Sequence, residues 1–209
     1  MIIKRLVALL ICAGAGLHPV LSAAKGFNYS YGEAGYTNLS TDEFDGSASG
    51  AAARLSFGAT DHIHVKAEYS HFSSVDIQKK TFFGKTTDSV DIDRFVIGIG
   101  GNFQVLEDVS FIKRLDVLTT VSYYDAEYTK DSNRSDRGYQ IEPGIRAQVM
   151  KKLELDASLT HLNIDNFDGT GFGAGAVYNF YKDFSASGTY KHFSHDDTDE
   201  FFLGVRLDF

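Results

Sequence analysis

The last nine residues of the chain alternate between two faces of different character. One face carries Phe201, Leu203, Val205, Leu207 and Phe209, and the other carries Phe202, Gly204, Arg206 and Asp208. A period of two is typical of a β-strand with one apolar face. At the edge of a soluble sheet, such an aromatic strand would pair with other chains and aggregate. The pattern therefore favours a strand that closes a barrel and turns its apolar face to lipid.

The N-terminal segment has the composition of a secretory signal peptide. Lys4 and Arg5 precede an apolar run over residues 6–16, and small residues at 22–24 offer a cleavage site. The run is shorter than the ~20 residues that a membrane-spanning helix needs. We therefore predict a signal peptide over residues 1–24 and one mature domain over residues 25–209.

The composition agrees with an all-β domain and excludes several functions. Gly (20), Tyr (11) and Phe (17) are abundant and Pro (2) is rare, as in chains built of strands. The 20 Lys+Arg stand against 28 Asp+Glu, whereas nucleic-acid binding requires a basic face. The only cysteine, Cys12, lies in the predicted signal peptide. The mature domain therefore has no thiol for a disulfide or a thiolate metal site. We also expect no bound metal and no cofactor.

Strand-like segments recur along the mature chain at the spacing of β-hairpins. They cover residues 27–39, 47–59, 63–72, 92–103, 115–128, 138–149, 153–163, 170–180, 184–193 and 200–209. Short turns are expected at 60–62, 150–152 and 181–183, a longer turn with room for a helical turn at 104–114, and polar loops at 40–46, 73–91, 129–137, 164–169 and 194–199. Short turns at one end and long loops at the other are typical of bacterial outer-membrane barrels. We predict an all-β, up-and-down antiparallel transmembrane barrel of ten strands, or of eight if one pair is over-divided.

Ionisable residues recur at the polar positions of these strands. In a barrel such positions face the lumen, where opposite charges can pair. The predicted lumen charge cluster consists of Arg54, Lys66, Glu68, Arg94, Glu142, Arg146, Glu154, Asp156, Arg206 and Asp208. A secreted or periplasmic β-sandwich is the alternative fold, and it would place its polar face in water. Within a barrel we expect a plugged or very narrow lumen, with a narrow solute or ion pore as the alternative.

Two residues disagree with a simple alternation. Glu33 shares parity with Tyr29 and Tyr31, which we expect to face lipid, so a β-bulge is predicted in the first strand. Pro143 lies on the apolar face of the sixth strand and removes one hydrogen-bond donor from the ladder. Both residues are expected to disturb the register locally without excluding the barrel.

These features together resemble the small outer-membrane barrel families of Gram-negative bacteria, of the kind typified by the OmpA transmembrane domain. The segment from Tyr69 to Gly101 is also similar to barrels grouped with the diffusible-signal-regulated outer-membrane proteins. The terminal alternation that ends in Phe209 resembles the signal read by the barrel-assembly machinery. The resemblance implies a non-enzymatic monomer with periplasmic termini and long extracellular loops. It also implies contact with lipopolysaccharide, an extracellular ligand, and roles in envelope integrity, adhesion or biofilm behaviour.

Tyrosines and histidines at the outer ends of the strands form a predicted lipid-interface belt. The belt consists of Tyr69, His71, Tyr123, His161, Tyr190 and His192. Part of it repeats, because residues 69–73 and 190–194 both have a Tyr-x-His-Phe-Ser pattern.

The pair His192 and Ser194 offers a third candidate function. It resembles the His-x-Ser motif of the lipid A 3-O-deacylases, in which a general base activates a serine. In this chain His195 replaces the asparagine that usually follows the serine, and Glu200 is the candidate for an orienting acid. A lipid A-modifying hydrolase therefore ranks behind a structural barrel and a narrow pore.

Overall fold

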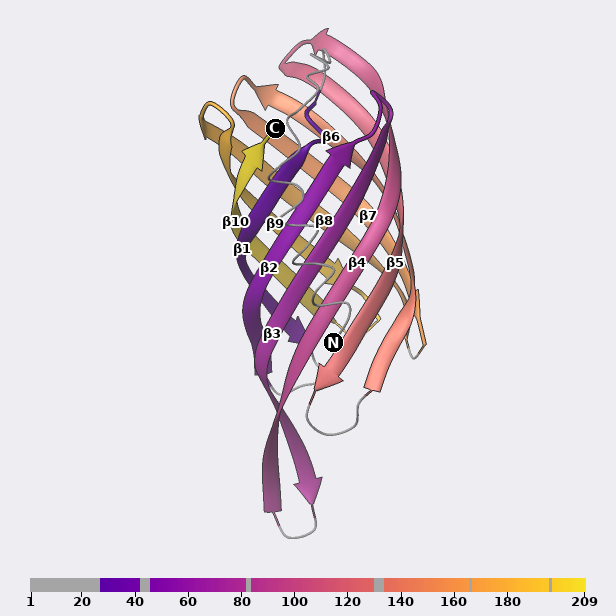
Figure 1. Ribbon diagram of the computed structural model, residues 1–209, viewed down its shortest axis with the longest axis vertical. Helices are drawn as coiled ribbons and strands as arrows, with labels where there is room; N and C mark the ends of the chain where they lie inside the picture. The colour runs from indigo at the N-terminus through magenta and orange to yellow at the C-terminus, as the bar shows by residue number, and fades with distance from the viewer. Residues whose placement is uncertain (1–26, 42–45, 82–83, 130–133, 166, 196) are drawn as a thin grey trace.

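The protein forms one closed barrel of ten antiparallel strands (Figure 1). The computed structural model describes residues 27–41, 46–81, 84–129, 134–165, 167–195 and 197–209. The strands are β1 (Tyr31–Thr41), β2 (Gly46–Gly58), β3 (Ile63–Thr81), β4 (Gly84–Val109), β5 (Ile112–Thr129), β6 (Arg134–Met150), β7 (Leu153–Ile164), β8 (Phe167–Tyr181), β9 (Phe184–Phe193) and β10 (Thr198–Asp208). Each pairs with its neighbours in sequence, and β1 closes the ring on β10. The ten-strand prediction is confirmed, whereas the predicted signal peptide lies outside the described residues.

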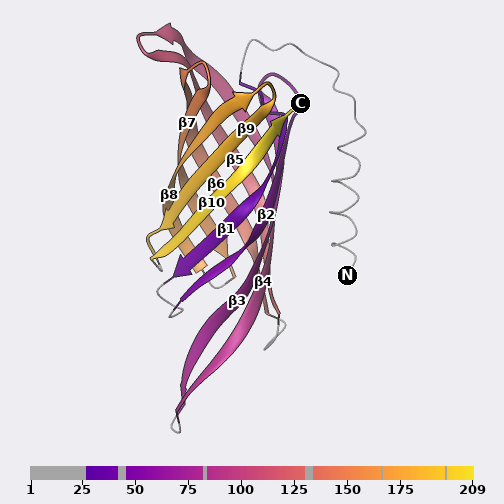
Figure 2. The same cartoon turned by 90° about the vertical axis from the view of Figure 1, so that its left-hand side faces the viewer.

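The barrel has two distinct ends. A hairpin of β3 and β4 projects far beyond one end, and the C-terminus lies at the other (Figures 1 and 2). The first described residues also lie near the C-terminus, because the Phe209 N–H donates to the Ser30 carbonyl at 3.0 Å. We call these the hairpin end and the terminal end.

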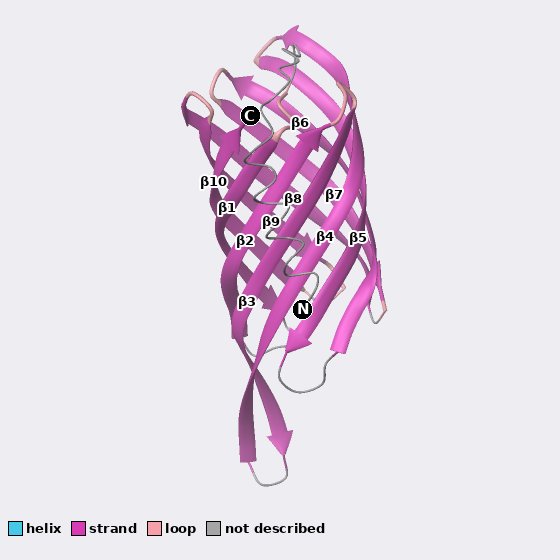
Figure 3. Ribbon diagram, viewed as in Figure 1, coloured by secondary structure: helices cyan, strands magenta, loops and turns pink. Residues whose placement is uncertain are grey.

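Two connections that the sequence analysis assigned to loops or turns are strands. β3 and β4 remain paired from Val75 with Val90 to Thr81 with Gly84, so the predicted loop 73–91 is the projecting hairpin. β4 and β5 pair as far as Val109 and Ile112, so the predicted turn 104–114 is also mostly strand. The second connection contains a register shift between Gln104 and Leu106, which interrupts the simple alternation that identifies a strand. The coloured ribbon of Figure 3 contains no helix in the part of the chain that the structure describes.

The outward face of the barrel wall is apolar. Leu159 is 64% exposed and Ile99 is 58% exposed, although both lie within strands. The five residues of the predicted assembly signal (Phe201, Leu203, Val205, Leu207 and Phe209) are all exposed. Because a water-soluble domain rarely exposes a continuous apolar band, this surface is one that lipid covers.

The first strand is regular, and the predicted β-bulge is wrong. β1 pairs in unbroken register with β10 and with β2 from Tyr31 to Ser40. Its odd-numbered side chains face the lumen, where the Tyr31 ring lies 3.7 Å from the Arg206 guanidinium carbon. Tyr29 also points inward, since its hydroxyl donates to Asp116 at 3.0 Å. Tyr31 stacks on a lumen arginine and Tyr29 bonds to a lumen aspartate, so both tyrosines face the lumen. Glu33 faces the lumen with them, and no bulge is needed.

Pro143 has the expected effect on the ladder but does not shift the register. β6 and β7 pair at Ile141 with His161 and again at Gly144 with Ser158, with a gap between. The pairing resumes in the same alignment after the gap. The missing donor therefore removes local bonds only.

Candidate functional site

Inward side chains form three layers along the lumen. An apolar layer lies at the hairpin end, a layer of paired charges lies in the middle, and a layer of arginines and aromatic rings lies at the terminal end. One cavity of about 490 Å³ runs along these layers, lined by Tyr29 towards the terminal end and by Thr198 towards the hairpin end. The lumen is therefore the main candidate site.

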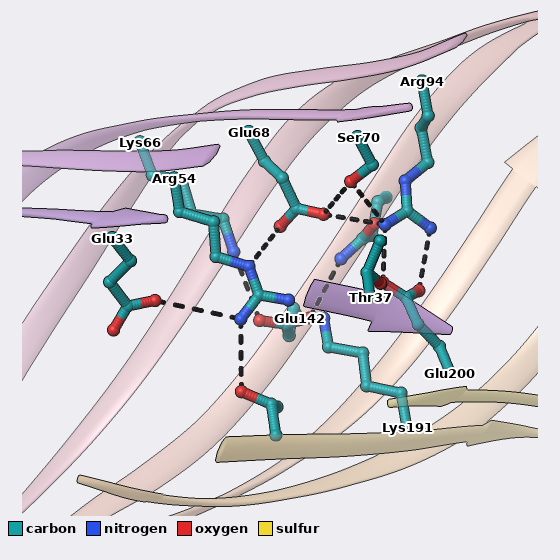
Figure 4. Close-up of polar contacts among 12 residues, drawn as sticks. Glu33, Thr37, Arg54, Lys66, Glu68, Ser70, Arg94, Glu142, Lys191 and Glu200 are labelled. Atoms are coloured by element: carbon teal, nitrogen blue, oxygen red, sulfur yellow. Dashed lines mark hydrogen bonds and ion pairs between the residues drawn. The ribbon is translucent and has the colours of Figure 1, made fainter. Parts of the chain in front are cut away.

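The middle layer is a set of acidic and basic side chains from strands on opposite sides of the barrel (Figure 4). We call it the charge layer, and it consists of Glu33, Arg54, Lys66, Glu68, Arg94, Glu142, Lys191 and Glu200. Glu68 forms ion pairs with Arg54 Nε at 3.1 Å and Arg94 Nη2 at 2.8 Å. Arg94 also donates from Nη1 to Glu200 Oε2 at 2.8 Å. Because β4 and β10 are not neighbours, the pair of Arg94 with Glu200 crosses the lumen.

A second set of pairs crosses the lumen at Glu142. Its carboxylate lies between Lys66 Nζ at 3.2 Å and Lys191 Nζ at 2.5 Å. The amide of Gln140 and the hydroxyl of Thr160 also donate to it, at 2.9 and 3.3 Å. Glu142 belongs to β6, whereas the two lysines belong to β3 and β9. Three strands that do not touch are therefore joined through one carboxylate.

The sequence analysis found part of the charge layer. Arg54, Lys66, Glu68, Arg94 and Glu142 were predicted and meet there, while Glu33, Lys191 and Glu200 were missed. Tyr29 and Tyr31 were expected to face lipid, so Glu33 was explained by a β-bulge and was not placed among the lumen charges. Lys191 and Glu200 alternate with the outward residues Tyr190, His192 and Phe201, and this parity was the signal that could have identified them.

The other predicted lumen charges lie at the terminal end. Arg146 donates from Nε to Glu154 at 3.0 Å, and Arg206 donates from Nε to Asp208 at 2.9 Å. Asp156 stands opposite Arg146 in the pairing of β6 with β7 and lines the same cavity. The predicted single cluster is therefore two separate layers.

The first described residues cross the mouth at the terminal end. Both Arg146 and Arg206 donate to the Asn28 carbonyl oxygen, at 3.2 and 3.1 Å. The buried ring of Phe27 lies 4.6 Å from the guanidinium carbon of Arg146 and 5.1 Å from that of Arg114. A guanidinium cation over the face of an aromatic ring is attracted to that ring, so the two arginines hold Phe27 in place. These contacts narrow the lumen below the charge layer.

On the outside of the barrel, the repeated Tyr-x-His fragments form two equivalent contacts. Tyr69 donates to Asp93, whose carboxylate also lies 2.9 Å from His71 Nδ1. Tyr190 donates to Asp199 at 2.6 Å, and Asp199 again lies 2.9 Å from the histidine. We call these the two Tyr–Asp–His sets. Their aspartates were missed, although each stands directly opposite its histidine in the strand pairing.

The remaining belt residues have looser contacts. His161 Nδ1 lies 3.8 Å from Asp168, and the Tyr123 hydroxyl donates to Asp125 at 3.4 Å. Tyr123 is 46% exposed. Contact of the belt with the lipid interface stays a prediction.

The surroundings of His192 differ from those that the deacylase motif predicts. Glu200 is not its orienting acid, because Glu200 faces the lumen and accepts from Arg94. The residue that orients His192 is Asp199. Ser194 follows the end of β9, and its N–H donates to the Thr170 carbonyl at 3.0 Å. The same histidine–aspartate contact at His71 indicates a repeated surface feature.

The described residues contain neither a metal-binding cluster nor a membrane-spanning helix. No three His, Cys, Asp or Glu side chains converge there as a metal site. No helix of that part of the chain has the length and apolar character to cross a membrane.

A closed antiparallel barrel with an apolar outer face and a charged lumen defines an integral outer-membrane protein. Residues 7–180 match the family model of the outer membrane protein beta-barrel domain. The chain belongs to this family, and the protein resides in the bacterial outer membrane.

The chain is similar to several solved structures at low sequence identity. The translocator domain of the autotransporter NalP from Neisseria meningitidis is 11% identical with a TM-score of 0.52, and the match covers 99% of this chain and 98% of that one. The KdgM porin in complex with disordered oligogalacturonate is 12% identical with a TM-score of 0.47, covering 85% and 99%. Ail, the attachment invasion locus protein of Yersinia pestis, is 15% identical with a TM-score of 0.39, covering 88% and 100%. A search of curated protein sequences finds no match.

Proposed function

We propose that this protein is a non-enzymatic barrel whose lumen is closed to ions and whose function lies in the envelope and at the cell surface. The observation that carries the proposal is the charge layer, in which Arg94 with Glu200 and Glu142 with Lys66 span the bore. An ion would have to separate these pairs to pass. Separation leaves opposite charges uncompensated in the lumen, which is unfavourable, so in this proposal the pairs hold the bore shut.

In this proposal the terminal end faces the periplasm and the hairpin end faces the medium. The hairpin of β3 and β4 then extends outside the cell, where it is the largest surface offered to an extracellular ligand. The two Tyr–Asp–His sets would lie at the level of the lipopolysaccharide head groups, since aromatic and histidine side chains favour that interface. Envelope integrity, adhesion or biofilm behaviour are the roles that such a surface supports.

A narrow pore is the second candidate function. It is favoured by the cavity of about 490 Å³, because its lining includes Tyr29 near one mouth and Thr198 near the other. A barrel of this size is only slightly wider than those whose interior is filled by side chains. The two candidates therefore differ in whether the charge layer interrupts this cavity.

Single-channel recording in a planar bilayer separates them. Residues 25–209 are refolded, and folding is confirmed by the faster gel mobility of unheated protein. The closed barrel predicts a silent bilayer at neutral pH. Discrete openings of the unaltered protein would make the pore the primary function.

A further inference from the structure

The lumen at the hairpin end is apolar, although the interior of such barrels is usually polar. Phe72 and Ile92 pack with Ala48 in a buried cluster, against which Leu39 and Tyr128 also pack. Leu162, Ile164 and Phe193 line the same cavity. We call the set of cavity-lining residues Leu39, Phe72, Ile92, Tyr128, Leu162, Ile164 and Phe193 the apolar chamber. Its members come from β1, β3, β4, β5, β7 and β9, so apolar side chains surround the lumen.

The chamber has a polar rim and a polar floor. Thr41, Asp136 and Thr198 line the cavity at the outer ends of their strands. Tyr124, Gln140 and Thr189 line it at the level of the charge layer. An apolar space of this kind, with a few polar groups at one end, is the usual form of a small-molecule site. The chamber is the hairpin-end part of a cavity of about 490 Å³ that also runs past the charge layer, and the whole cavity lies in the range of such sites.

The charges of the floor are already paired, which constrains the ligand. Arg94 is held by Glu68 and Glu200, and Glu142 is held by two lysines. A charged head group would have to displace one of these partners and leave it buried without compensation. A hydroxyl or carbonyl head group carries no charge, so it can lie against the floor without displacing an ionic partner, and the floor favours it.

We propose that the apolar chamber binds a small uncharged amphiphile that enters through the hairpin end. Its aliphatic chain lies among Leu39, Phe72 and Ile164, and its hydroxyl or carbonyl group lies against the floor. This site goes beyond the proposed envelope function. Binding in the chamber does not depend on whether ions pass the charge layer, because the chamber lies between that layer and the hairpin end.

Tryptophan fluorescence can test the site, because the chain contains no tryptophan. Phe193→Trp places the reporter in the chamber, and Phe201→Trp places a matched reporter on the lipid-facing surface, where Phe201 is 44% exposed. The refolded full chain in lipid nanodiscs is titrated with 10-bromodecan-1-ol, whose bromine quenches tryptophan on contact. Specific binding predicts saturable quenching at Phe193→Trp and only gradual, non-saturating quenching at Phe201→Trp. The same curve at both positions would show partition into lipid alone and overturn the proposal.

A polar substitution and a charged probe sharpen the test. Leu39→Asn in the Phe193→Trp background is expected to weaken binding about tenfold, equivalent to about 1.4 kcal/mol. Ser40→Asn is the matched control, since Ser40 is the exposed neighbour on the opposite face of β1, and it should leave binding unchanged. Gel mobility confirms that each variant is folded. If Leu39→Asn does not fold, the comparison of Phe193→Trp with Phe201→Trp still tests the proposal. 10-Bromodecanoate should bind about tenfold more weakly than the alcohol. Equal binding of the two probes, or no effect of Leu39→Asn, would contradict the proposed site.

Discussion

Arg94 and Glu200 each directly follow the aspartate of one Tyr–Asp–His set, and their side chains meet across the lumen. Arg94 follows Asp93 on β4 and Glu200 follows Asp199 on β10. The aspartates bind histidines on the outside, while the next residues form a hydrogen bond of 2.8 Å on the inside. Because alternate side chains of a strand point to opposite faces, the aspartate of each outer set directly precedes a residue of the charge layer.

Removal of one partner of this pair should destabilise the barrel strongly. Arg94→Ala leaves the half-buried Glu68 and the buried Glu200 near each other without their common cation. We expect the free energy of unfolding to fall by about 3–5 kcal/mol, measured by urea titration in lipid vesicles with gel mobility as the readout. The double variant Arg94→Ala/Glu200→Ala should recover part of the loss, because it removes the unpaired carboxylate as well.

An exposed ion pair provides the control for that prediction. Arg137 lies 3.3 Å from Asp125, and its side chain is 54% exposed. Arg137→Ala should change the free energy of unfolding by less than about 1 kcal/mol. An equally large loss for the two alanine variants would argue against a special role of the charge layer.

A charge on the outer face should be costly only where lipid covers the wall. Leu159→Arg places a guanidinium on the exposed apolar face of β7, and we expect a loss of about 2–4 kcal/mol in the same urea titration. Asp183→Arg, in the turn between β8 and β9, should be nearly neutral. Similar tolerance of both changes would contradict a membrane position of the middle of β7.

Gly50 should be required for barrel folding. A Cβ atom built on it would lie 1.7 Å from the His71 carbonyl oxygen, which belongs to the backbone of β3. Because a backbone cannot move aside like a side chain, Gly50→Ala should cost about 3 kcal/mol or more and lower the refolded fraction on unheated gels. Gly101→Ala is the matched control, since its nearest contact is 3.7 Å away. If Gly50→Ala refolds as well as the control, the close approach of β2 and β3 is wrong.

The protein should leave lipid A unchanged. His192 is oriented by Asp199 as His71 is by Asp93, so the contact at His192 repeats a surface feature. We expect lipid A incubated with the refolded protein to keep all its acyl chains in mass spectrometry. Loss of a chain with the unaltered protein, but not with Ser194→Ala, would instead show a hydrolase.

The faces of most strands were predictable because lipid demands apolar side chains and the lumen accepts polar ones. Tyr29 and Tyr31 were wrongly expected to face lipid, and a β-bulge was predicted at Glu33, because a tyrosine suits either a lipid interface or stacking on arginine, as Tyr31 does on Arg206. The partners within the lumen could not be predicted, since Arg94 and Glu200 are 106 residues apart and meet across the bore. Such contacts depend on the stagger of all ten strands, which local patterns do not record. The apolar chamber was missed for a related reason, because inward positions were expected to be polar.

The most direct test of the account is a planar-bilayer comparison of the unaltered protein with Arg94→Ala/Glu142→Ala/Glu200→Ala, which removes both sets of cross-lumen pairs. Arg137→Ala serves as the control for loss of a cation outside the charge layer. We predict a silent bilayer for the unaltered protein and the control, and discrete openings for the triple variant. Openings of the unaltered protein, or silence of the folded triple variant, would contradict closure of the lumen by the charge layer.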